Sequence, residues 1–433
     1  MKKILVVTYY WPPSGGPGVQ RWLKFVKYLR RSGFGAVVVT VDPEKASYPV
    51  FDHSLEKEIP EGTEVHRTNS FEPLRIFSSF FKKEKVPYAG IPDRDKMSLA
   101  GKISLYIRAN FFIPDARKGW NRYAFRECCR IIEQEKITAV ITSSPPHSTQ
   151  LTGLRLKQKY GIRWIADLRD PWTDIYYYHK LHHSERAKRK DLAYELSVLE
   201  NADHILVTSN RTAKQYSAKS AAVAGKIHVI PNGFDEDDFQ TEAPASPGKF
   251  TVTFIGTINE QFGIGKFVAA VKNAQRSLPS VPFEVKFVGQ TDRAVENLLR
   301  SELGEMLVMP GYVSHKESVE EMRKAQLLLL VIPQGPNQGT VPGKTFEYLA
   351  AQRSIICLAP EGSSAADIIR SCEAGRSFVH DDQKGMEEYI VSLAKEWQAK
   401  GDLKINNGNF RQYSRRSQAE ILAGLISGAT PKT

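Results

Sequence analysis

The sequence predicts an α/β protein that is built from parallel sheets and divided into two domains. Three observations carry this prediction: short apolar runs recur along the chain, helical patterns follow most of them, and the alternation stops and restarts once. At 433 residues the chain is also too long for one ordinary hydrophobic core. Strands that alternate with helices in this way form parallel sheets with helices on both faces.

The first series of strands and helices begins at the N-terminus. A strand at 4–8 is followed by the loop YYWPPSGGPGVQRW and by apolar residues at helical spacing. Further strands are expected at 36–41, 139–142, 163–166, 204–208 and 226–230, and helices at 122–134, 151–160 and 211–217. Residues 1–235 are therefore predicted to form an N-terminal domain.

A change in composition separates this domain from the next. Residues 236–248 combine an acidic run with Pro, Ser and Ala, which indicates a linker. A second α/β domain is predicted over 249–405, and residues 406–433 are expected to contain a last helix at 410–427. The strands of the second domain are expected at 250–255, 283–288, 327–332 and 354–358.

Composition and charge limit the class of protein. The net charge of +12 suits an anionic partner, which could be nucleic acid, a membrane surface or a phosphorylated small molecule. A helix-turn-helix, zinc spacing or an RNP-like strand is absent from the sequence, so no nucleic acid is expected. No apolar run approaches the roughly 18 residues that span a bilayer, and the cysteines lack paired spacing. We therefore expect a cytoplasmic protein with reduced thiols.

The most informative stretch is VPGKTFEY. A helix is expected to begin after Val341, Pro342 and Gly343, which places Lys344 in its first turn. A cation there faces the positive end of the helix dipole, so a bound anion would explain both charges. Glu347 lies one turn on and could accept hydrogen bonds from sugar hydroxyls. An ordinary surface ion pair is the alternative.

Glycines in the first loop indicate a second site. Gly15, Gly16 and Gly18 can expose main-chain amides at a helix N-terminus, where an anion or a hydroxyl would bind. A dinucleotide-binding fold is the alternative, because Asp42 ends the second strand where a ribose-binding acid would lie. The pattern GGPG is not GxGxxG, and the loop is longer than a tight phosphate turn, which argues against that alternative.

Polar residues also follow two later strands of the first domain. His147 lies in a loop after a strand, where it could act on a ligand or merely cap the next helix. Asp167, Arg169 and Asp170 end the next strand and could orient a hydroxyl or phosphate, or form a structural Asp–Arg network.

Three histidines, His179, His182 and His183, have a spacing that would place them on one helix face. The sequence shows no third-ligand cluster or carboxylate pattern that would orient them around a metal. A solvated basic helix is therefore expected, and no metal site.

Two stretches, residues 71–85 and 105–120, mix aromatic with basic residues. A helix in an anionic membrane interface gains both from buried apolar area and from nearby Lys or Arg. Peripheral membrane contact is therefore one interpretation, and aromatic side chains buried in the core are the other.

The motifs VPGKTFEYLAA, VIPNGFD, FIGT, VGQ and the GGPG loop occur in an order that resembles glycosyltransferases of the GT-B fold, similar to the retaining enzymes of family 4. The resemblance covers nearly the whole chain. It implies two Rossmann-like, doubly wound domains that face a cleft, a donor-binding C-terminal domain and a last helix that crosses back. Similar VPxK-x-x-E segments occur in a branch that acts on surface polysaccharides.

The resemblance also implies roles for residues. Glu347 matches the second glutamate of the family's E-x7-E motif, which holds the ribose of the donor, whereas Gly339 stands in place of the first glutamate. The family often has Arg and Lys in the loop that here begins with Gly256, so Lys344 is expected to take over part of the diphosphate binding. Further donor contacts are expected from Thr257, Gly289, Val341, Pro342, Gly343 and Thr345.

The implied reaction moves a sugar from a nucleotide-diphosphate sugar, with a UDP-sugar favoured, to a glycan or lipid-linked acceptor. Lys344 and helix-terminal amides can stabilise the departing diphosphate without a metal or other cofactor. Asp170 is preferred over His147 as the residue that orients the acceptor, with Asp167, Arg169 and the glycine loop in support. A GT-B nucleotide-sugar epimerase and a non-catalytic anion- or nucleic-acid-binding protein are the alternatives. The implied location is the cytoplasm, at the inner face of the membrane.

Overall fold

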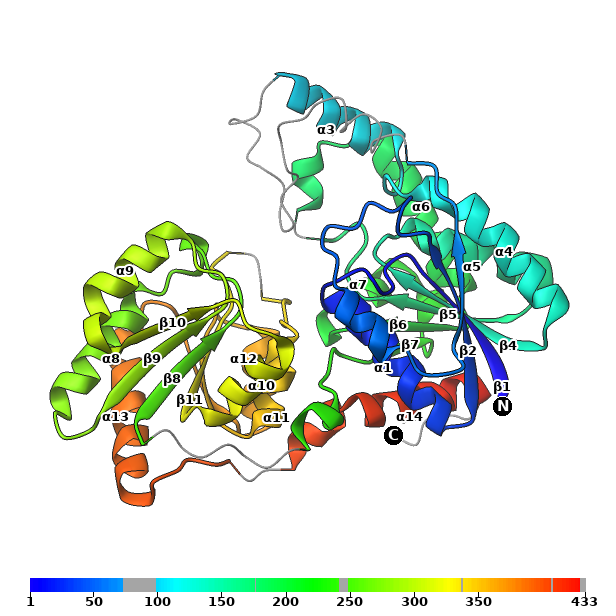
Figure 1. The fold of residues 1–433 in the computed structure, drawn as a ribbon. Helices are drawn as coiled ribbons and strands as arrows, with labels where there is room; N and C mark the ends of the chain where they lie inside the picture. Colours follow the sequence, from blue (N-terminus) through cyan, green and yellow to red (C-terminus); the bar gives the residue numbers. More distant parts are fainter. Residues whose placement is uncertain (73–98, 176, 241–247, 336–337, 406–407, 429–433) are drawn as a thin grey trace. The chain divides into compact units, whose positions relative to one another are not determined.

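The computed structural model describes residues 1–72, 99–175, 177–240, 248–335, 338–405 and 408–428 (Figure 1). The chain divides into two compact units. Unit 1 contains Met1–Pro231 and Gln418–Thr433, and unit 2 contains Asn232–Ser417. Each unit has one parallel sheet with helices packed against it, which confirms the predicted α/β class.

The sheet of unit 1 has seven strands in the order β3-β2-β1-β4-β5-β6-β7, and all its pairs are parallel. The order reverses between β1 and β4, which is the place where open α/β sheets bind ligands at their carboxyl edge. The strands are β1 Lys2–Thr8, β2 Phe34–Val41, β3 Glu64–Thr68, β4 Ile137–Ser144, β5 Arg163–Leu168, β6 His204–Val207 and β7 Ile227–Val229.

Helices cover both faces of this sheet. In α1, Trp22, Val26 and Leu29 recur at helical spacing and are buried, which explains why this segment packs as an amphipathic helix. Apolar residues of α14 complete the same core, including Leu422, which is fully buried. The helices are α1 Pro17–Arg31, α3 Leu99–Phe111, α4 Asn121–Gln134, α5 Ser148–Tyr160, α6 Glu185–Asn201, α7 Asn210–Lys219 and α14 Arg415–Ser427.

Unit 2 has a six-stranded parallel sheet in the order β10-β9-β8-β11-β12-β13. Strand β11 is buried along its whole length, as its continuous apolar sequence predicts for a central strand. The strands are β8 Phe250–Ile255, β9 Phe283–Val288, β10 Leu307–Gly311, β11 Leu327–Val331, β12 Ser354–Leu358 and β13 Gly375–Phe378. The helices are α8 Gly265–Ser277, α9 Arg293–Leu303, α10 His315–Lys324, α11 Lys344–Ala351, α12 Ser364–Ser371 and α13 Gln383–Lys400.

The boundary between the units differs from the predicted linker at 236–248. Unit 2 begins at Asn232, and the 3-10 helix Glu236–Phe239 belongs to it. Phe239 packs edge-on to Phe234, with 6.0 Å between the ring centres. The acidic run therefore does not form a linker: its apolar flanking residues attach it to unit 2. Residues 241–247 of the expected linker lie outside the described residues.

Several elements were not expected from the sequence. They are the strands β3, β10 and β13, which lie at sheet edges, and the helix α6, which begins with the strongly charged sequence ERAKRK. The last helix is divided into the 3-10 helix Asn409–Tyr413 and α14. Further 3-10 helices are His53–Glu58, Lys118–Trp120, Tyr178–Leu181, Ala221–Val223, Glu260–Phe262 and Gly304–Met306.

Most of the stretch 71–85 lies outside the described residues. The stretch 105–120 falls on α3 and the segment after it, and α3 leaves several apolar side chains exposed. In the part of the chain that the structure describes, no helix has the length and apolar character that a membrane span requires.

Candidate functional site

Lys344 is the first residue of α11, and its side chain reaches the end of strand β8 in unit 2. The Lys344 ammonium donates a hydrogen bond to the carbonyl oxygen of Ile255, with 2.8 Å between Nζ and O, and lies 4.0 Å from the centre of the Phe254 ring. Burial lowers the pKa of Lys344 to about 8, against an opposing effect of Glu347. A desolvated cation is thus held at the carboxyl edge of the sheet.

Two glycines next to Lys344 allow the main chain to approach closely. Gly256 and Gly289 have φ values of 125° and 121°, which residues with a side chain rarely adopt. A Cβ atom on Gly289 would lie 2.3 Å from the carbonyl oxygen of Gly256, and one on Gly256 would lie 3.0 Å from Lys344 Nζ. Any other residue at these two positions would therefore displace the main chain or the ammonium.

Glu347 lies one turn after Lys344 on α11. The two side chains form no ion pair, so the surface ion pair that the sequence allowed as an alternative is not present. Burial raises the pKa of Glu347, whereas His315 lowers it and Asp238 raises it further. The Glu347 carboxyl is half-buried and accepts no hydrogen bond from the described residues. It is therefore available for a ligand hydroxyl.

The other predicted donor residues lie around the start of α11 and in the loop after β8. Thr345 is fully buried, and its hydroxyl has no partner among the described residues. Its amide donates to the carbonyl oxygen of Pro342 at 3.0 Å. Val341 and Gly343 are half-exposed, and Thr257 is exposed. The Thr345 side chain thus fills the interior, and Lys344 supplies the positive charge at this end of the helix.

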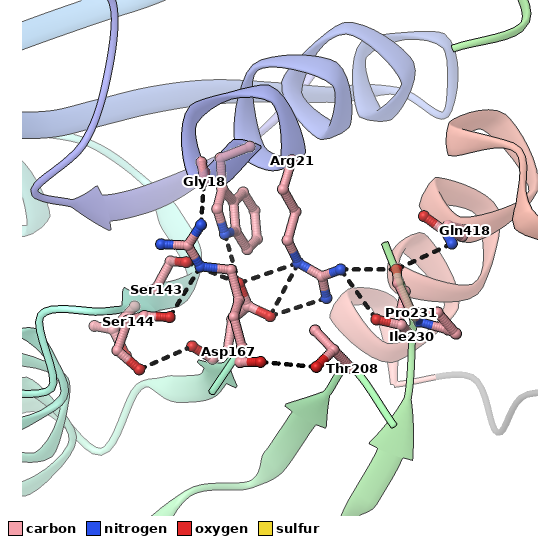
Figure 2. A network of polar contacts seen from close by, with 12 residues as sticks. Gly18, Arg21, Ser143, Ser144, Asp167, Thr208, Ile230, Pro231 and Gln418 are labelled. Atoms are coloured by element: carbon pink, nitrogen blue, oxygen red, sulfur yellow. Dashed lines mark hydrogen bonds and ion pairs between the residues drawn. The ribbon is translucent and has the colours of Figure 1, made fainter. Parts of the chain in front are cut away.

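Asp167, at the end of β5, is the centre of a buried network in unit 1 (Figure 2). Arg21 of α1 donates to both carboxylate oxygens, with 3.0 Å between Nη2 and Oδ1, and neither side chain has exposed surface. Trp22 Nε1 and the Ser143 hydroxyl donate to Oδ2 at 2.7 and 2.8 Å. Because the carboxylate is occupied inside the protein, the structural Asp–Arg network is favoured over a ligand contact.

Arg169 joins the loops that follow β1 and β4. Its guanidinium donates to the carbonyl oxygens of Gly18 at 2.7 Å, Ser144 at 2.9 Å and Pro145 at 3.3 Å. A Cβ atom on Gly18 would lie 2.5 Å from Arg169 Nη1, so a larger residue there would displace the guanidinium from its hydrogen bonds. Arg169 therefore fixes the glycine loop beside the loop that carries His147.

The glycine loop presents the first turn of α1. The Gly15 amide is occupied, since it donates to the carbonyl oxygen of Val50 at 2.9 Å. Gly16 is the N-cap residue, with φ at 99° and no side chain to cap the helix. Pro17 has no amide hydrogen, and the Val19 amide donates to the carbonyl oxygen of Gly16 at 3.1 Å, so Gly18 carries the first-turn amide that could bind an anion or a hydroxyl.

His147 stacks on Trp172, with 4.9 Å between the ring centres and 13° between the planes. Burial lowers the pKa of His147 to about 3, and Arg169 lowers it further. The imidazole is therefore neutral near pH 7, and its Nδ1 is buried without a partner among the described residues. A neutral ring in this place can orient a hydroxyl but cannot neutralise a phosphate.

Asp170 differs from Asp167 in having an available carboxyl. Burial raises the pKa of Asp170, and Arg169 opposes this effect. The side chain is half-buried and accepts no hydrogen bond from the described residues, whereas the main-chain oxygen accepts one from the Tyr216 hydroxyl at 3.4 Å. Of the two aspartates, Asp170 is the one that could accept a proton or a hydrogen bond from a ligand.

The three clustered histidines do not lie on one regular helix, so the expectation of a solvated basic helix is wrong. His179 is in the 3-10 helix Tyr178–Leu181, and His182 follows with φ at 52°. His183 stacks on Tyr178 with 4.4 Å between the ring centres. Among the residues that the structure describes, no three His, Cys, Asp or Glu side chains gather as metal ligands.

Comparison with solved structures relates this architecture to known proteins. A sucrose-phosphate synthase from Thermosynechococcus elongatus is 16% identical over 99% of both chains, with a TM-score of 0.56. A mutant of S. aureus TarM, solved with fondaparinux, α-GlcNAc-glycerol and UDP, is 12% identical over 98% of this chain and all of its own, with a TM-score of 0.56. A UDP-GlcNAc 2-epimerase from Methanocaldococcus jannaschii is 9% identical over 99% of this chain and all of its own, with a TM-score of 0.54.

The chain has the GT-B fold. Residues 91–238 also match the family model of Glycosyltransferase Family 4, so the resemblance indicated by the sequence motifs is confirmed. No curated protein sequence gave a significant match. The GT-B fold is shared by the transferases and the epimerase, so the fold alone does not choose between these two activities.

Sequence reasoning missed two residues that hold the candidate sites of this GT-B protein in place. The Tyr348 hydroxyl is buried; it accepts from the Ile255 amide at 3.0 Å and lies 3.4 Å from the Leu329 carbonyl oxygen, which fixes α11 against two strands. Arg21 binds Asp167 and also donates to the carbonyl oxygen of Pro231 at 2.9 Å. Tyr348 could have been found because it directly follows Glu347 in the sequence. No local sequence pattern indicated that Arg21 is buried.

Proposed function

We propose that the protein is a retaining glycosyltransferase that moves a hexose from a UDP-sugar to a glycan or lipid-linked saccharide in surface polysaccharide synthesis. The observation that carries this proposal is the Lys344 ammonium, held against the Ile255 carbonyl oxygen and the Gly256 main chain at the carboxyl edge of a GT-B sheet. The solved TarM complex, which contains UDP, supports a uridine nucleotide as the first donor to test.

The chemistry follows from the leaving group. When the bond from the sugar to the diphosphate breaks, negative charge grows on the phosphate oxygens, and a nearby cation lowers the energy of that state. Lys344 supplies this cation from a desolvated position, where its effect is larger than in water. The chain's own lysine thus takes the role that a metal has in other transferases, and no cofactor is required.

Glu347 is assigned to the ribose of the donor. Its half-buried carboxyl lies one helical turn from Lys344 and has no hydrogen-bond donor among the described residues. A carboxylate can accept hydrogen bonds from both hydroxyls of a ribose. Gly339 offers no side chain for the sugar, so the sugar contacts come from other groups.

On unit 1, Asp170 is assigned to the acceptor hydroxyl and His147 to a secondary orienting role. The Asp170 carboxyl has no internal partner among the described residues, and burial raises its pKa toward the range that suits a base. Asp167 and Arg169 act indirectly, because they hold the loops in position. The proposal includes a lipid-linked acceptor, to which the enzyme transfers the sugar at the inner face of a membrane.

Binding of nucleotide sugars is the first test of the proposal. UDP-sugars are expected to raise the melting temperature of the whole protein, because a ligand that binds only the folded state stabilises it by about 2.7 kcal/mol at 100 times its Kd. The Glu347→Ala variant is expected to lose most of this shift, and Glu388→Ala, on the exposed face of α13, to keep it. Absence of a shift with every nucleotide sugar would overturn the proposal.

A positive shift is followed by a product assay. Incubation with the UDP-sugar and EDTA in the presence of membrane-extracted saccharide acceptors is expected to give a glycosylated product with the anomeric configuration retained. Formation of an isomeric UDP-sugar without an acceptor would instead identify an epimerase.

The pH dependence gives a separate prediction for Lys344. Its pKa of about 8 means that the ammonium loses its proton above this pH, so kcat/KM for the donor is expected to fall tenfold per pH unit there. Folding stability changes in the opposite direction. Because the pKa of Lys344 is lower in the folded protein than the ordinary value of 10.5, the folded state binds fewer protons than the unfolded state. The contribution of Lys344 to the free energy of unfolding therefore rises between pH 8 and pH 10.5. A loss of kcat/KM above pH 8 without a loss of melting temperature would separate deprotonation from unfolding.

A further inference from the structure

Phe51, in the chain segment that follows β2, is the exposed end of a row of contacting aromatic rings. It is 51% exposed, whereas Tyr9, at the other end of the row, is fully buried. Tyr48 lies between them and packs edge-on against both, with 5.9 Å to the ring centre of Tyr9 and 5.6 Å to that of Phe51. Trp120 supports Tyr9 from the core at 5.5 Å. The core thus fixes the position of one aromatic ring at the surface.

The main chain on either side of Phe51 is hydrogen-bonded to the glycine loop. The amide of Gly15 donates to the carbonyl oxygen of Val50 at 2.9 Å, and the amide of Asp52 donates to that of Pro13 at 2.7 Å. A Cβ atom on Gly15 would lie 3.2 Å from both Val50 Cγ1 and Asp52 Cβ, so the glycine lets the two segments approach closely. Phe51 is therefore attached to the glycine loop on both sides.

The glycine loop connects Phe51 with the residues assigned to the acceptor. Gly18 follows in this loop, and its carbonyl oxygen accepts a hydrogen bond from Arg169 at 2.7 Å. Asp170, whose carboxyl is assigned to the acceptor hydroxyl, is the next residue of the chain. Phe51 and Asp170 thus lie on segments that are joined through one loop at the carboxyl edge of the same sheet.

The surroundings of Phe51 indicate the class of ligand. Val50 is 47% exposed, and polar residues follow at once, with His53 stacked on Phe51 at 6.2 Å and 19° and paired with Glu56 at 2.9 Å. Two adjacent apolar side chains are far smaller than the roughly 800 Å² that a stable protein partner covers. The carboxylates of Asp52 and Glu56 disfavour an anionic surface. The ligand that fits is small and neutral, with an apolar face and hydroxyl groups.

We propose that Phe51 binds a neutral sugar ring of the acceptor by stacking, in a subsite beside the glycine loop. A pyranose gathers C–H groups on one face and carries hydroxyls around its edge. The negative face of an aromatic ring attracts such C–H groups, and the carboxylates of Asp52 and Glu56 can accept hydrogen bonds from the hydroxyls. This inference rests on the proposed function and narrows it, because it makes a neutral pyranose the part of the acceptor that this edge of unit 1 recognises.

The test is saturation-transfer NMR of the full chain with the methyl glycosides of glucose, galactose, mannose and N-acetylglucosamine. Transfer to the ring C–H protons of at least one of them is expected. Phe51→Leu keeps an apolar side chain but removes the ring, and it is expected to weaken binding about tenfold, because a stacked ring contributes beyond its buried area. Phe51→Trp keeps an aromatic face and is expected to retain binding. Tyr312→Ser removes an aromatic side chain that is 82% exposed in unit 2, and it is expected to bind normally.

Three outcomes contradict the inference. They are no transfer to any of the four glycosides, equal binding by Phe51→Leu and the unmodified chain, and a dimer in light scattering that Phe51→Leu dissociates. A circular-dichroism melt checks that each variant is folded, and the shift of its melting temperature with UDP-sugars is measured on the same samples. A normal donor shift without glycoside binding refutes the Phe51 subsite alone, whereas glycoside binding without any donor shift refutes the proposed transferase and leaves the sugar subsite in place.

Discussion

Replacing Lys344 with alanine is expected to lower kcat by about 10²–10³-fold, the usual effect of removing one preorganised group that stabilises developing charge. The variant should remain folded, because the ammonium is already desolvated and its loss relieves that cost. Only one hydrogen bond, to the Ile255 carbonyl oxygen, is removed. The measurement is the initial rate of product formation at saturating donor, together with the melting temperature.

Two further variants make this result specific. Lys384→Ala removes a cation whose side chain is exposed on α13, and it should leave kcat unchanged. Asp170→Asn should lower kcat without changing donor affinity, since Asp170 is assigned to the acceptor. If Asp170→Asn left turnover unchanged while Lys344→Ala abolished it, Asp170 would have no part in the reaction. Normal turnover of Lys344→Ala would refute the role of the lysine itself.

Replacing Asp167 with asparagine is expected to destabilise unit 1 by about 3–5 kcal/mol, because it leaves the Arg21 guanidinium as a buried and unpaired charge. The hydrogen bonds from Trp22 and Ser143 to the carboxylate would weaken as well. For a domain of this size 1 kcal/mol shifts the melting temperature by about 2–4 °C, so unit 1 should melt roughly 6–20 °C lower. Calorimetry, which resolves separate transitions of the two units, is the measurement.

The matched control for this change is Glu296→Gln in unit 2. Glu296 forms an exposed ion pair with Arg300 at 2.8 Å, one turn apart on α9. Exposed pairs of this kind contribute little, typically below about 1 kcal/mol, so the melting temperature should change by a few degrees at most. If Asp167→Asn changed the melting temperature as little as Glu296→Gln does, the Arg21 guanidinium would have to be solvated in the variant, which would contradict the expected cost of a buried, unpaired charge.

Both sheets could be predicted in outline because their central strands are continuous apolar runs. Strand β11 and strand β1 are of this kind, and both lie where the sequence placed them. Strands β3 and β13 could not be predicted, since an edge strand is covered less and needs fewer apolar residues. The segment of α6 was missed for a related reason, because its first turn is solvated and its buried residues include Asp191 and Glu195.

The candidate site could be predicted only where one short motif contains it. Lys344 and Glu347 are three residues apart, so helix geometry alone relates them. Asp167 was harder, because its partner Arg21 lies 146 residues away and no local pattern distinguishes a buried arginine from an exposed one. The same Asp-Leu-Arg-Asp motif thus contains one occupied carboxylate and one available carboxyl, a difference that depends on tertiary contacts.

The discontinuous composition of unit 1 has a consequence for biosynthesis. Leu422 and Ile426 of α14 pack in the same core as Ile4 and Val6 of β1. A ribosome makes β1 first and α14 last, with roughly 190 residues of unit 2 between them. At about 5–20 residues per second, the nascent N-terminal sheet waits about 10–40 s for the helix that closes it. During that interval the apolar surface that α14 later covers is exposed. Chaperones that bind nascent chains therefore have the longest time to bind the N-terminal half of the protein.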